Sequence, residues 1–278
     1  MRFVGVDGGG SGCRGAVCDA AGNVLAQADG GPANIDTDPD GAARRLSDLL
    51  ARLCGAGPAP ARIVLGLAGA NAPGRSEALT DRLAHPGLVV VSDVATAVAG
   101  AIGSADGIVC ALGTGSVFAR QSGGGLRVIG GWGFRLGDEA SGAWIGRQAV
   151  ALALRAADGF VPASPLLTAL LDECGGPPGA MRRWSEATPA EFAALVPRIV
   201  AAQAGADPAA ARIIAAARDE IEAAIRLLQP ADRTLPVTLT GGLAPVFAPM
   251  LMASGWTLRR PAGSPLDGAL ALARRGVA

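Results

Sequence analysis

The chain has 278 residues, half of them apolar and 17% charged, and its 24 basic and 24 acidic side chains give a formal net charge of zero. This composition supports a substantial folded core in one large domain or two ordinary ones, and it excludes a disordered chain. A neutral chain offers no electrostatic footprint for nucleic acid or for an anionic membrane, so we expect neither as a partner.

The sequence contains no Lys, no Tyr and a single His, His85. A chain without Lys has no P-loop lysine and no Schiff-base lysine, and one His cannot build a His-rich metal site. His85 precedes Pro86 and reads as a surface-turn residue without a catalytic role. A Ser-His-Asp triad is therefore rejected.

The five cysteines are odd in number, none has CxxC spacing, and most lie in apolar surroundings. This pattern indicates small buried side chains in a reducing compartment. An acid and three glycines, Asp7 to Gly10, stand where a signal peptide needs its apolar stretch. The longest apolar region, 88–118, is interrupted by Asp93 and Asp106, which argues against a membrane span. We expect a cytoplasmic protein.

The first part of the chain predicts a β-meander followed by alternating helices and strands. The first helix begins after Asp38 or Asp40, either of which can cap it. The expected strands cover 3–6, 13–18, 24–28, 63–67 and 88–91, and the expected helices cover 39–53, 76–83 and 93–102.

The second part begins with the same pattern and then becomes helical. A strand, a Gly-rich turn that ends in Ser and a returning strand occur at 7–11 and again at 113–116. The repetition indicates either an internal duplication or two unrelated hairpins in a chain with 41 glycines. The expected strands cover 108–112, 117–120, 126–129, 235–239 and 257–258, and the expected helices cover 140–156, 165–172, 189–202, 208–228, 244–252 and 265–274.

Without Lys, a phosphate group must be held by backbone N–H groups, hydroxyls, Arg or a metal ion. The two Gly-rich turns supply such N–H groups, because glycine permits close backbone approach and positive φ angles. Asp7 ends the first strand, and its carboxylate suits Mg²⁺. A further Gly pair, Gly241-Gly242, follows a late strand. Together these features favour a phosphate-binding site.

Five motifs that follow one another along residues 3–272 carry a family resemblance: GVDGGGS at 5–11, SDVATA at 92–97, GTGS at 113–116, GGWGFRLGDEASG at 130–142 and TGGLAP at 240–245. The sequence resembles the BadF/BadG/BcrA/BcrD ATPase family of the actin/hexokinase/Hsp70 superfamily, and within it the glucosamine and N-acetylglucosamine kinases. The resemblance implies an α/β fold of two ribonuclease H-like (actin-like ATPase) lobes, with a nucleotide and sugar cleft between them. The first lobe would cover 1–108, and the nucleotide-binding second lobe 109–278, with a helix-rich insertion at about 155–230.

The resemblance also implies an activity and its residues: transfer of a phosphoryl group from ATP, with Mg²⁺, to the 6-hydroxyl of a small-molecule amino sugar. Asp93 would be the general base and Asp7 would lie near the metal, while Ser11 stands where the family usually has Thr. The implied phosphate-binding residues are Gly8, Gly9, Gly10, Ser11, Gly113, Thr114, Gly115 and Ser116; the adenosine-binding residues are Gly241 and Gly242; the sugar-binding residues are Asn34, Gly69, Ala70, Asp93, Trp132 and Asp138.

Each role has a structural alternative that the sequence leaves open. Asp93 also suits a helix N-cap, Trp132 a core aromatic, Asp138 the acidic start of a helix, and Asn34 a turn.

Two other functions remain open. One is an activator ATPase of 2-hydroxyacyl-CoA dehydratases, whose iron–sulfur cysteines this chain does not match. The other is a nucleotide or sugar sensor without turnover, which does not need the intact Asp93. A homodimer is compatible with the resemblance.

Overall fold

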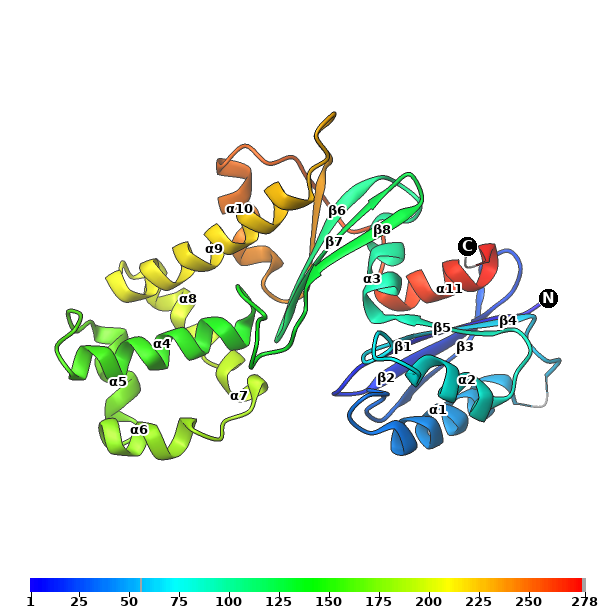
Figure 1. Ribbon diagram of the computed structural model, residues 1–278, viewed down its shortest axis with the longest axis horizontal. Helices are drawn as coiled ribbons and strands as arrows, with labels where there is room; N and C mark the ends of the chain where they lie inside the picture. Colours follow the sequence, from blue (N-terminus) through cyan, green and yellow to red (C-terminus); the bar gives the residue numbers. More distant parts are fainter. Residues whose placement is uncertain (56, 277–278) are drawn as a thin grey trace. The chain divides into compact units, whose positions relative to one another are not determined.

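The computed structural model describes residues 1–55 and 57–276, which form two α/β units (Figure 1). Of these residues, unit 1 contains those within 1–106, 121–126 and 260–276, and unit 2 contains 107–120 and 127–259. The α/β class with two lobes is therefore confirmed. The division by contacts is not the single predicted boundary at 108/109, since residues 107–108 lie in unit 2, and residues 121–126 and the last helix lie in unit 1.

The sheet of unit 1 has the strand order β3-β2-β1-β4-β5. It consists of β1 (Phe3–Gly8), β2 (Cys13–Cys18), β3 (Val24–Gly30), β4 (Arg62–Leu67) and β5 (Leu88–Ser92). The first three strands form the predicted antiparallel meander, and β4 and β5 run parallel to β1. Gly8 pairs with Leu67, and Leu67 with Ser92, so the carboxyl ends of β1, β4 and β5 lie at one edge.

Helices cover both faces of this sheet (Figure 1). They are α1 (Pro39–Cys54) and α2 (Arg75–Leu83) on one face, and α3 (Asp93–Ile102) and α11 (Pro265–Arg275) on the other. Asp38, not Asp40, caps α1 by accepting the Gly41 N–H. Two glycines let α3 and α11 touch: a Cβ at Gly100 would lie 1.9 Å from the Ser264 carbonyl oxygen, and one at Gly268 2.0 Å from that of Thr96. This close contact holds α11 in unit 1.

The sheet of unit 2 repeats the topology of the first, in the order β10-β9-β6-β7-β8. Its strands are β6 (Gly107–Leu112), β7 (Ser116–Ser122), β8 (Gly125–Gly130), β9 (Val237–Thr240) and β10 (Leu258–Arg259). Three consecutive strands joined by tight turns are again followed by two parallel strands, since β9 pairs parallel with β6 and β10 with β9. A whole repeated topology favours the internal duplication over two unrelated hairpins.

The helical stretch of unit 2 lies between β8 and β9 and contains more helices than the sequence predicted. It comprises α4 (Gly142–Ala157), α5 (Pro165–Asp172), α6 (Pro177–Trp184), α7 (Pro189–Ala193), α8 (Val196–Ala204) and α9 (Pro208–Leu228), and α10 (Ala244–Ala253) follows β9. The helix expected over 189–202 is broken into α7 and α8 near Pro197, whose ring nitrogen has no N–H to donate. The sequence missed α6, because its Pro177-Pro178 start resembles a loop.

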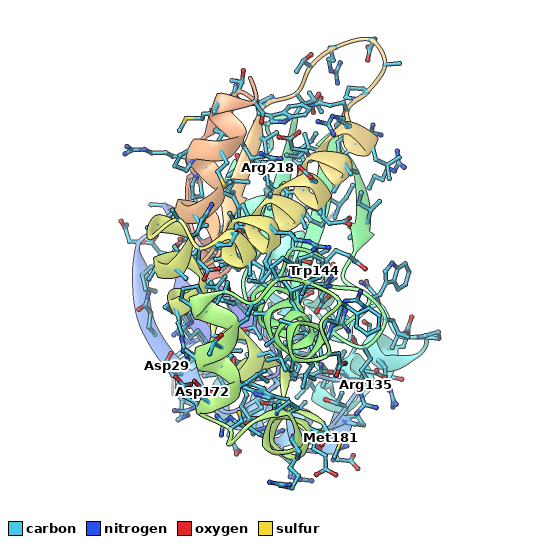
Figure 2. All side chains as sticks on the ribbon, turned by 90° about the vertical axis from the view of Figure 1, so that its left-hand side faces the viewer. Asp29, Arg135, Trp144, Asp172, Met181 and Arg218 are labelled. Carbon is cyan, nitrogen blue, oxygen red and sulfur yellow. The ribbon has the colours of Figure 1, made fainter. Side chains whose placement is uncertain are left out.

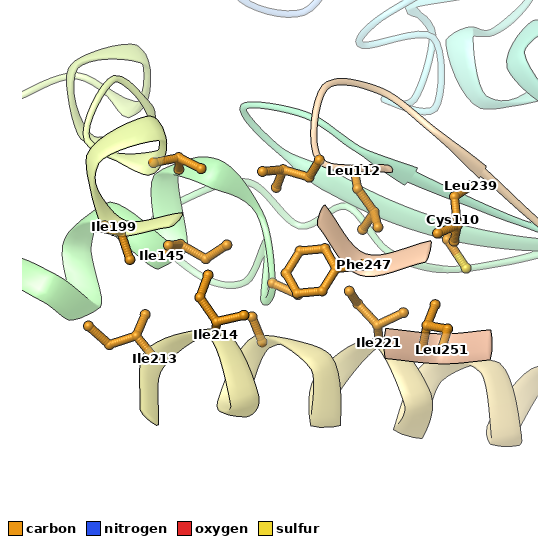
Figure 3. Close-up of a cluster of buried hydrophobic side chains, with 14 of the residues drawn as sticks. Cys110, Leu112, Ile145, Ile199, Ile213, Ile214, Ile221, Leu239, Phe247 and Leu251 are labelled. Atoms are coloured by element: carbon orange, nitrogen blue, oxygen red, sulfur yellow. The ribbon is translucent and has the colours of Figure 1, made fainter. Parts of the chain in front are cut away.

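The core of unit 2 is built around Phe247, which has no exposed surface and lies among Leu112, Ile214 and Leu251 (Figure 3). This packing fastens α9 and α10 to the inner strand β6, so the loop that follows β6 stands on a rigid base. In the described part of the chain, none of the helices combines the length and the apolar character that a bilayer crossing requires.

Candidate functional site

A cavity of about 380 Å³ opens in unit 1 at the carboxyl ends of β1 and β5. Ligands of α/β proteins collect at this edge of a parallel sheet. Five of the predicted residues line the cavity: Asp7, Gly8, Gly9, Ser11 and Asp93. The sequence did not single out the other five, which are Gly12, Cys13, Arg14, Asp29 and Gly30.

The loop between β1 and β2 presents unpaired hydrogen-bond donors. The Gly9 N–H donates to the Gly12 carbonyl at 2.9 Å. Among the described residues, the N–H groups of Gly10 and Ser11 and the Ser11 hydroxyl have no hydrogen-bond partner. Such a set of backbone donors fits a phosphate group.

The glycines of this loop leave space. A Cβ at Gly9 or Gly10 would meet nothing within 4 Å, and neither residue has a positive φ angle. Of the two properties expected of these glycines, Gly9 and Gly10 do not use the positive φ angle. Glycine here keeps the surface above the backbone open, so that a ligand can reach the N–H groups.

Asp93 is the first residue of α3, and its neighbour Ser92 is the N-cap. The Ser92 hydroxyl accepts the Ala95 N–H at 3.2 Å, and Asp93 Oδ1 accepts the Val94 N–H at 2.9 Å. The alternative interpretation of Asp93 as the cap is wrong. Burial raises the pKa of its carboxyl above the ordinary Asp value. A half-buried carboxylate that the fold does not need for capping is available for proton transfer.

Asp7 lies near the end of β1 and shares the cavity with Asp93. Burial raises its pKa, the Arg14 guanidinium lowers it, and the Asp93 carboxylate raises it further. The described residues contain no group of three or more His, Cys, Asp or Glu side chains placed to hold a metal ion. A Mg²⁺ ion at Asp7 would therefore take most of its oxygen ligands from phosphate and water, as this ion commonly does.

The structure brings together the predicted sugar contacts of unit 1, although they do not line this cavity. A Cβ at Gly69, whose φ is +84°, would lie 2.7 Å from Asn34 Oδ1. That oxygen accepts the N–H groups of Asp36 and Thr37, which confirms the turn interpretation of Asn34. The side-chain NH₂ group of Asn34 makes no hydrogen bond within the described residues and is free to donate. Ala70 follows in the same loop.

The second Gly-rich loop, in unit 2, is fastened to α4. The Gly142 N–H donates to the Gly113 carbonyl at 2.8 Å and the Ala143 N–H to the Thr114 carbonyl at 3.1 Å. The Gly113 N–H donates to the Gly115 carbonyl, and the nearly buried Ser116 hydroxyl donates to the Glu139 carbonyl at 2.7 Å. Helix α4 therefore sets the shape of this loop.

Asp138 lies against that loop with an unusual backbone. Its φ is +59°, and that of Ala140 is +64°. The Gly133 N–H donates to Asp138 Oδ1, and a Cβ at Gly115 would lie 2.9 Å from Asp138 Oδ2. Burial raises the pKa of Asp138. Ser141 is the N-cap of α4, so the interpretation of Asp138 as the helix start is wrong. Strain of this kind concentrates at functional sites.

Trp132 is 74% exposed, so it is not a core aromatic. It lines a second cavity, of about 1040 Å³, in unit 2. Aromatic rings from α6 and α7 form part of its wall, and Trp184 and Phe192 pack with ring centroids 5.0 Å apart. Arg135 and Met181, labelled in Figure 2, line the same cavity. An exposed indole beside a cavity suits the predicted pocket wall.

Gly241 packs directly on the second Gly-rich loop. Its φ is +88°, and a Cβ there would lie 2.3 Å from the Leu112 carbonyl oxygen. Gly242 faces open space. Within unit 2 the structure thus joins the predicted adenosine-binding pair to the predicted phosphate loop.

The sequence contained a signal for the missed residues Arg14 and Asp29. In the meander, Asp7 pairs with Arg14, and Arg14 pairs with Asp29. Directly opposed residues of antiparallel strands point to one face. Extending the hairpin register from Asp7 would have placed both residues beside it.

The chain is similar to several known proteins. The sequence profile of the BadF/BadG/BcrA/BcrD ATPase family matches residues 4–251. A glucosamine kinase from Vibrio cholerae is 28% identical over 79% of this chain and 78% of its own. An N-acetylmuramic acid/N-acetylglucosamine kinase from Clostridium acetobutylicum is 33% identical over 57% of this chain and 55% of its own. A crystal structure from Chromobacterium violaceum, provisionally named an N-acetylglucosamine kinase, is 36% identical with a TM-score of 0.83 and covers 98% of both chains.

Proposed function

We propose that this chain, which belongs to the BadF/BadG/BcrA/BcrD ATPase family, is an ATP-dependent amino-sugar kinase acting on the 6-hydroxyl of glucosamine or N-acetylglucosamine. One observation carries the proposal: Asp93, Asp7 and the loop with unpaired N–H groups line a single cavity. The names of three relatives, all kinases of amino sugars, support the substrate class.

Asp93 is the proposed general base. As the 6-oxygen forms its bond to the γ-phosphorus, the bond from that phosphorus to the ADP oxygen breaks and the hydroxyl proton passes to the Asp93 carboxylate. A raised pKa favours this role, because a base whose pKa lies nearer neutrality holds the proton better in the transition state. The backbone N–H groups of Gly10 and Ser11 hold phosphate oxygens at the same cavity.

The remaining predicted contacts belong to the same proposal. Loop 113–116 would hold further phosphate oxygens, and Gly241 and Gly242 would pack against the adenosine. Mg²⁺ near Asp7 would offset phosphate charge that this Lys-free chain leaves largely unopposed. The sugar would contact Asn34, Gly69, Ala70, Asp93, Trp132 and Asp138. We place this activity in the cytoplasm, where the five free thiols would stay reduced, and consider a homodimer its assembly.

A coupled ADP-release screen tests the function. The panel contains glucosamine, N-acetylglucosamine, N-acetylmuramic acid and glucose, each with and without excess EDTA. We expect turnover of an amino sugar that EDTA abolishes, with glucosamine used at least as well as N-acetylglucosamine. The glucosamine expectation rests on the DGGGSGCR opening at 7–14.

Product analysis by phosphorus NMR then separates a 6-phosphate from a 1-phosphate. Sugar-independent ATP binding without turnover would favour the sensor alternative. A coloured, iron-containing preparation would favour the dehydratase activator. Robust phosphorylation in excess EDTA would contradict the proposed use of Mg²⁺.

A further inference from the structure

Two loops of unit 1, one after β3 and one after β4, carry the predicted sugar contacts of this unit. The loop after β3 is fixed at both sides. The Ala33 N–H donates to the Gly9 carbonyl of the loop between β1 and β2, at 2.8 Å. The Ile35 N–H donates to the Ala68 carbonyl at 3.0 Å, and the Ile35 side chain is buried. Residues of this loop therefore hold a set position at the edge of the sheet.

The loop after β4 lies next to the start of α3, because Leu67 of β4 pairs with Ser92 of β5. Gly69 stands two residues after Leu67, and Asp93 one residue after Ser92. In a hexopyranose, C2 lies across the ring from C5, which carries the 6-hydroxymethyl group. For a sugar whose 6-hydroxyl reaches Asp93 and whose ring contacts Gly69, the nitrogen on C2 therefore points away from the proposed base.

Asp36 lies directly against Gly69. A Cβ at Gly69 would be 2.6 Å from the Asp36 nitrogen and 2.8 Å from the Asp36 Cβ, so only glycine leaves room for this contact. The Asp36 N–H donates to Asn34 Oδ1 at 2.9 Å, which places Asp36 beside two predicted sugar contacts. Asp93 lines the cavity of unit 1 and Asp36 does not, so Asp36 lies at the end of these contacts away from the base.

The Asp36 carboxylate has unused hydrogen-bond acceptor positions. Within the described residues its one hydrogen-bond partner is Arg75 Nε, at 3.4 Å, and the Asp36 side chain is 51% exposed. The neighbouring Asp38 is fully engaged, since it accepts the Gly41 N–H and pairs with Arg45 at 2.6 Å. A carboxylate with free lone pairs suits an ammonium group, which has three donors and no acceptor.

We propose that Asp36 binds the ammonium group of glucosamine and so favours this sugar over N-acetylglucosamine. The inference rests on the proposed function, since it names the residue that selects between its two substrates. A free amine carries a positive charge near neutral pH, whereas the acetamide of N-acetylglucosamine is neutral and offers a single N–H. Because Asp36 contacts the nitrogen and not the reacting hydroxyl, it changes sugar binding and leaves the chemical step unchanged.

The test measures kcat and KM for glucosamine and N-acetylglucosamine in the native chain, in Asp36→Asn and in the control Asp40→Asn. Asp40 is an exposed aspartate in the first turn of α1 that pairs with Arg82. We expect Asp36→Asn to raise the KM for glucosamine about tenfold, because a hydrogen bond between charged groups is lost. Its kcat for glucosamine and both constants for N-acetylglucosamine should change by less than about twofold. Asp40→Asn should behave like the native chain.

Arg75→Gln separates direct binding by Asp36 from a structural role of its ion pair. This substitution removes the guanidinium and leaves the Asp36 carboxylate, so the preference for glucosamine should persist or rise. If Arg75→Gln lost the preference as Asp36→Asn does, the ion pair would carry it and the inference would fall. An unchanged ratio of the two kcat/KM values in Asp36→Asn, or equal losses for both sugars, would also overturn the inference.

The two proposals fail differently. A native chain that phosphorylates N-acetylglucosamine but not glucosamine would overturn the inference and leave the kinase assignment standing. If the native chain phosphorylates neither sugar, calorimetry of sugar binding decides. A selective loss of glucosamine affinity in Asp36→Asn would then support the contact while the kinase assignment falls, and a native chain that binds neither sugar would remove both. Urea unfolding checks the fold of each variant, and Asp36→Ser repeats the test if Asp36→Asn does not fold.

Discussion

The two Gly-rich hairpins have the same position in two sheets of the same topology, yet their surroundings differ. Loop 8–12 of unit 1 keeps the N–H groups of Gly10 and Ser11 unpaired, with open space above Gly9 and Gly10. Loop 113–116 of unit 2 is bonded to the first turn of α4 and to the Glu139 carbonyl, and Gly241 packs against its base. We call loop 8–12 the open loop, because its N–H donors are unpaired. We call loop 113–116 the braced loop, because hydrogen bonds and packing with its neighbours hold it in place.

The difference shows that duplicated sequence patterns do not imply duplicated roles. In unit 1 the side chains of Asp7, Arg14 and Asp93 line the same cavity as this open loop. In unit 2 the equivalent loop is held by neighbours that fix its shape. Substitutions in the open loop should therefore change ligand binding and rate, whereas substitutions in the braced loop should first change stability.

The largest expected effect is on rate, at Asp93. Asp93→Asn should lower kcat by about 10²- to 10⁴-fold, because the proposed base is lost, while ATP affinity changes little. The fold should survive, since Ser92 rather than Asp93 caps α3. Steady-state kinetics beside calorimetry of the same variant measure both quantities.

Ser92→Ala is the matched control for Asp93→Asn. Losing the N-cap costs about 1 kcal/mol of stability, and kcat should change much less than in Asp93→Asn. Turnover of Asp93→Asn within about threefold of the parent, under 1 kcal/mol in barrier height, would mean that the base lies elsewhere.

The next effect contrasts two glycines. Gly241→Ala should destabilise the protein by about 2 kcal/mol or more, because it combines a left-handed φ with a Cβ 2.3 Å from the Leu112 carbonyl oxygen. Gly9→Ala should leave the free energy of unfolding within about 0.5 kcal/mol and weaken ATP binding instead. Urea unfolding and calorimetry of the pair measure this contrast. If Gly241→Ala and Gly9→Ala destabilised the protein equally, the distinction between a loop that binds ligand and a loop that supports the fold would be wrong.

A smaller effect contrasts two serines at equivalent positions. Ser116→Ala should cost about 1 kcal/mol of stability, since its buried hydroxyl donates to the Glu139 carbonyl. Ser11→Ala should cost almost nothing in stability, because its hydroxyl has no partner among the described residues, and should reduce ATP affinity. Thermal unfolding with and without ATP separates the two outcomes: the ATP-induced rise in Tm should shrink more in Ser11→Ala than in Ser116→Ala, whose hydroxyl is already engaged by the Glu139 carbonyl.

Sequence reasoning predicted most of this fold and half of the residues that line the cavity of unit 1, for identifiable reasons. Strands and helices such as 3–8 and 208–228 carry strong periodicity, and motif order along the chain gave the family. Asp7 was singled out because it stands at the end of the first strand, and Asp93 because it matches a family motif directly after the strand 88–91. What sequence reasoning missed depends on tertiary packing: the break between α7 and α8, the placement of α11 in unit 1 through Gly100 and Gly268, and the cap at Ser92.

Arg14 was missed for a different reason. Residue-by-residue scanning for motifs ignores the partner strand, and only the register of the β1–β2 hairpin puts Arg14 opposite Asp7. The open space over Gly9 was also unpredictable, since glycine is equally common where φ is positive, as at Gly241. Contacts, not residue types, separate those two uses of glycine.

The smallest expected effect concerns how pH changes stability, and it has opposite signs in the two units. Burial raises the pKa of Asp93 in the folded state above its unfolded value, so the folded state binds more protons between these two values. Stability conferred by the protonated form is then present at low pH and lost as pH rises through the folded pKa. Asp93→Asn should therefore unfold at a higher urea concentration than the parent at pH 7, and the gain should vanish below the ordinary Asp pKa.

Asp207 of unit 2 is the opposite case, because the pKa of its carboxyl is lowered in the folded state. Burial raises its pKa, but hydrogen bonds from the Leu166 and Ala210 N–H groups, among others, outweigh this and leave the pKa below the ordinary value. Its carboxylate adds stability above the unfolded pKa, which is lost as pH falls through the folded pKa. Asp207→Asn should thus destabilise the protein at pH 7 and less so in acid. Urea midpoints for both variants, measured from pH 7 down to below the ordinary Asp pKa, test both signs. A loss of stability in Asp93→Asn at pH 7 would mean that the Asp93 carboxylate stabilises the fold, as the Asp207 carboxylate does, and would contradict the predicted sign.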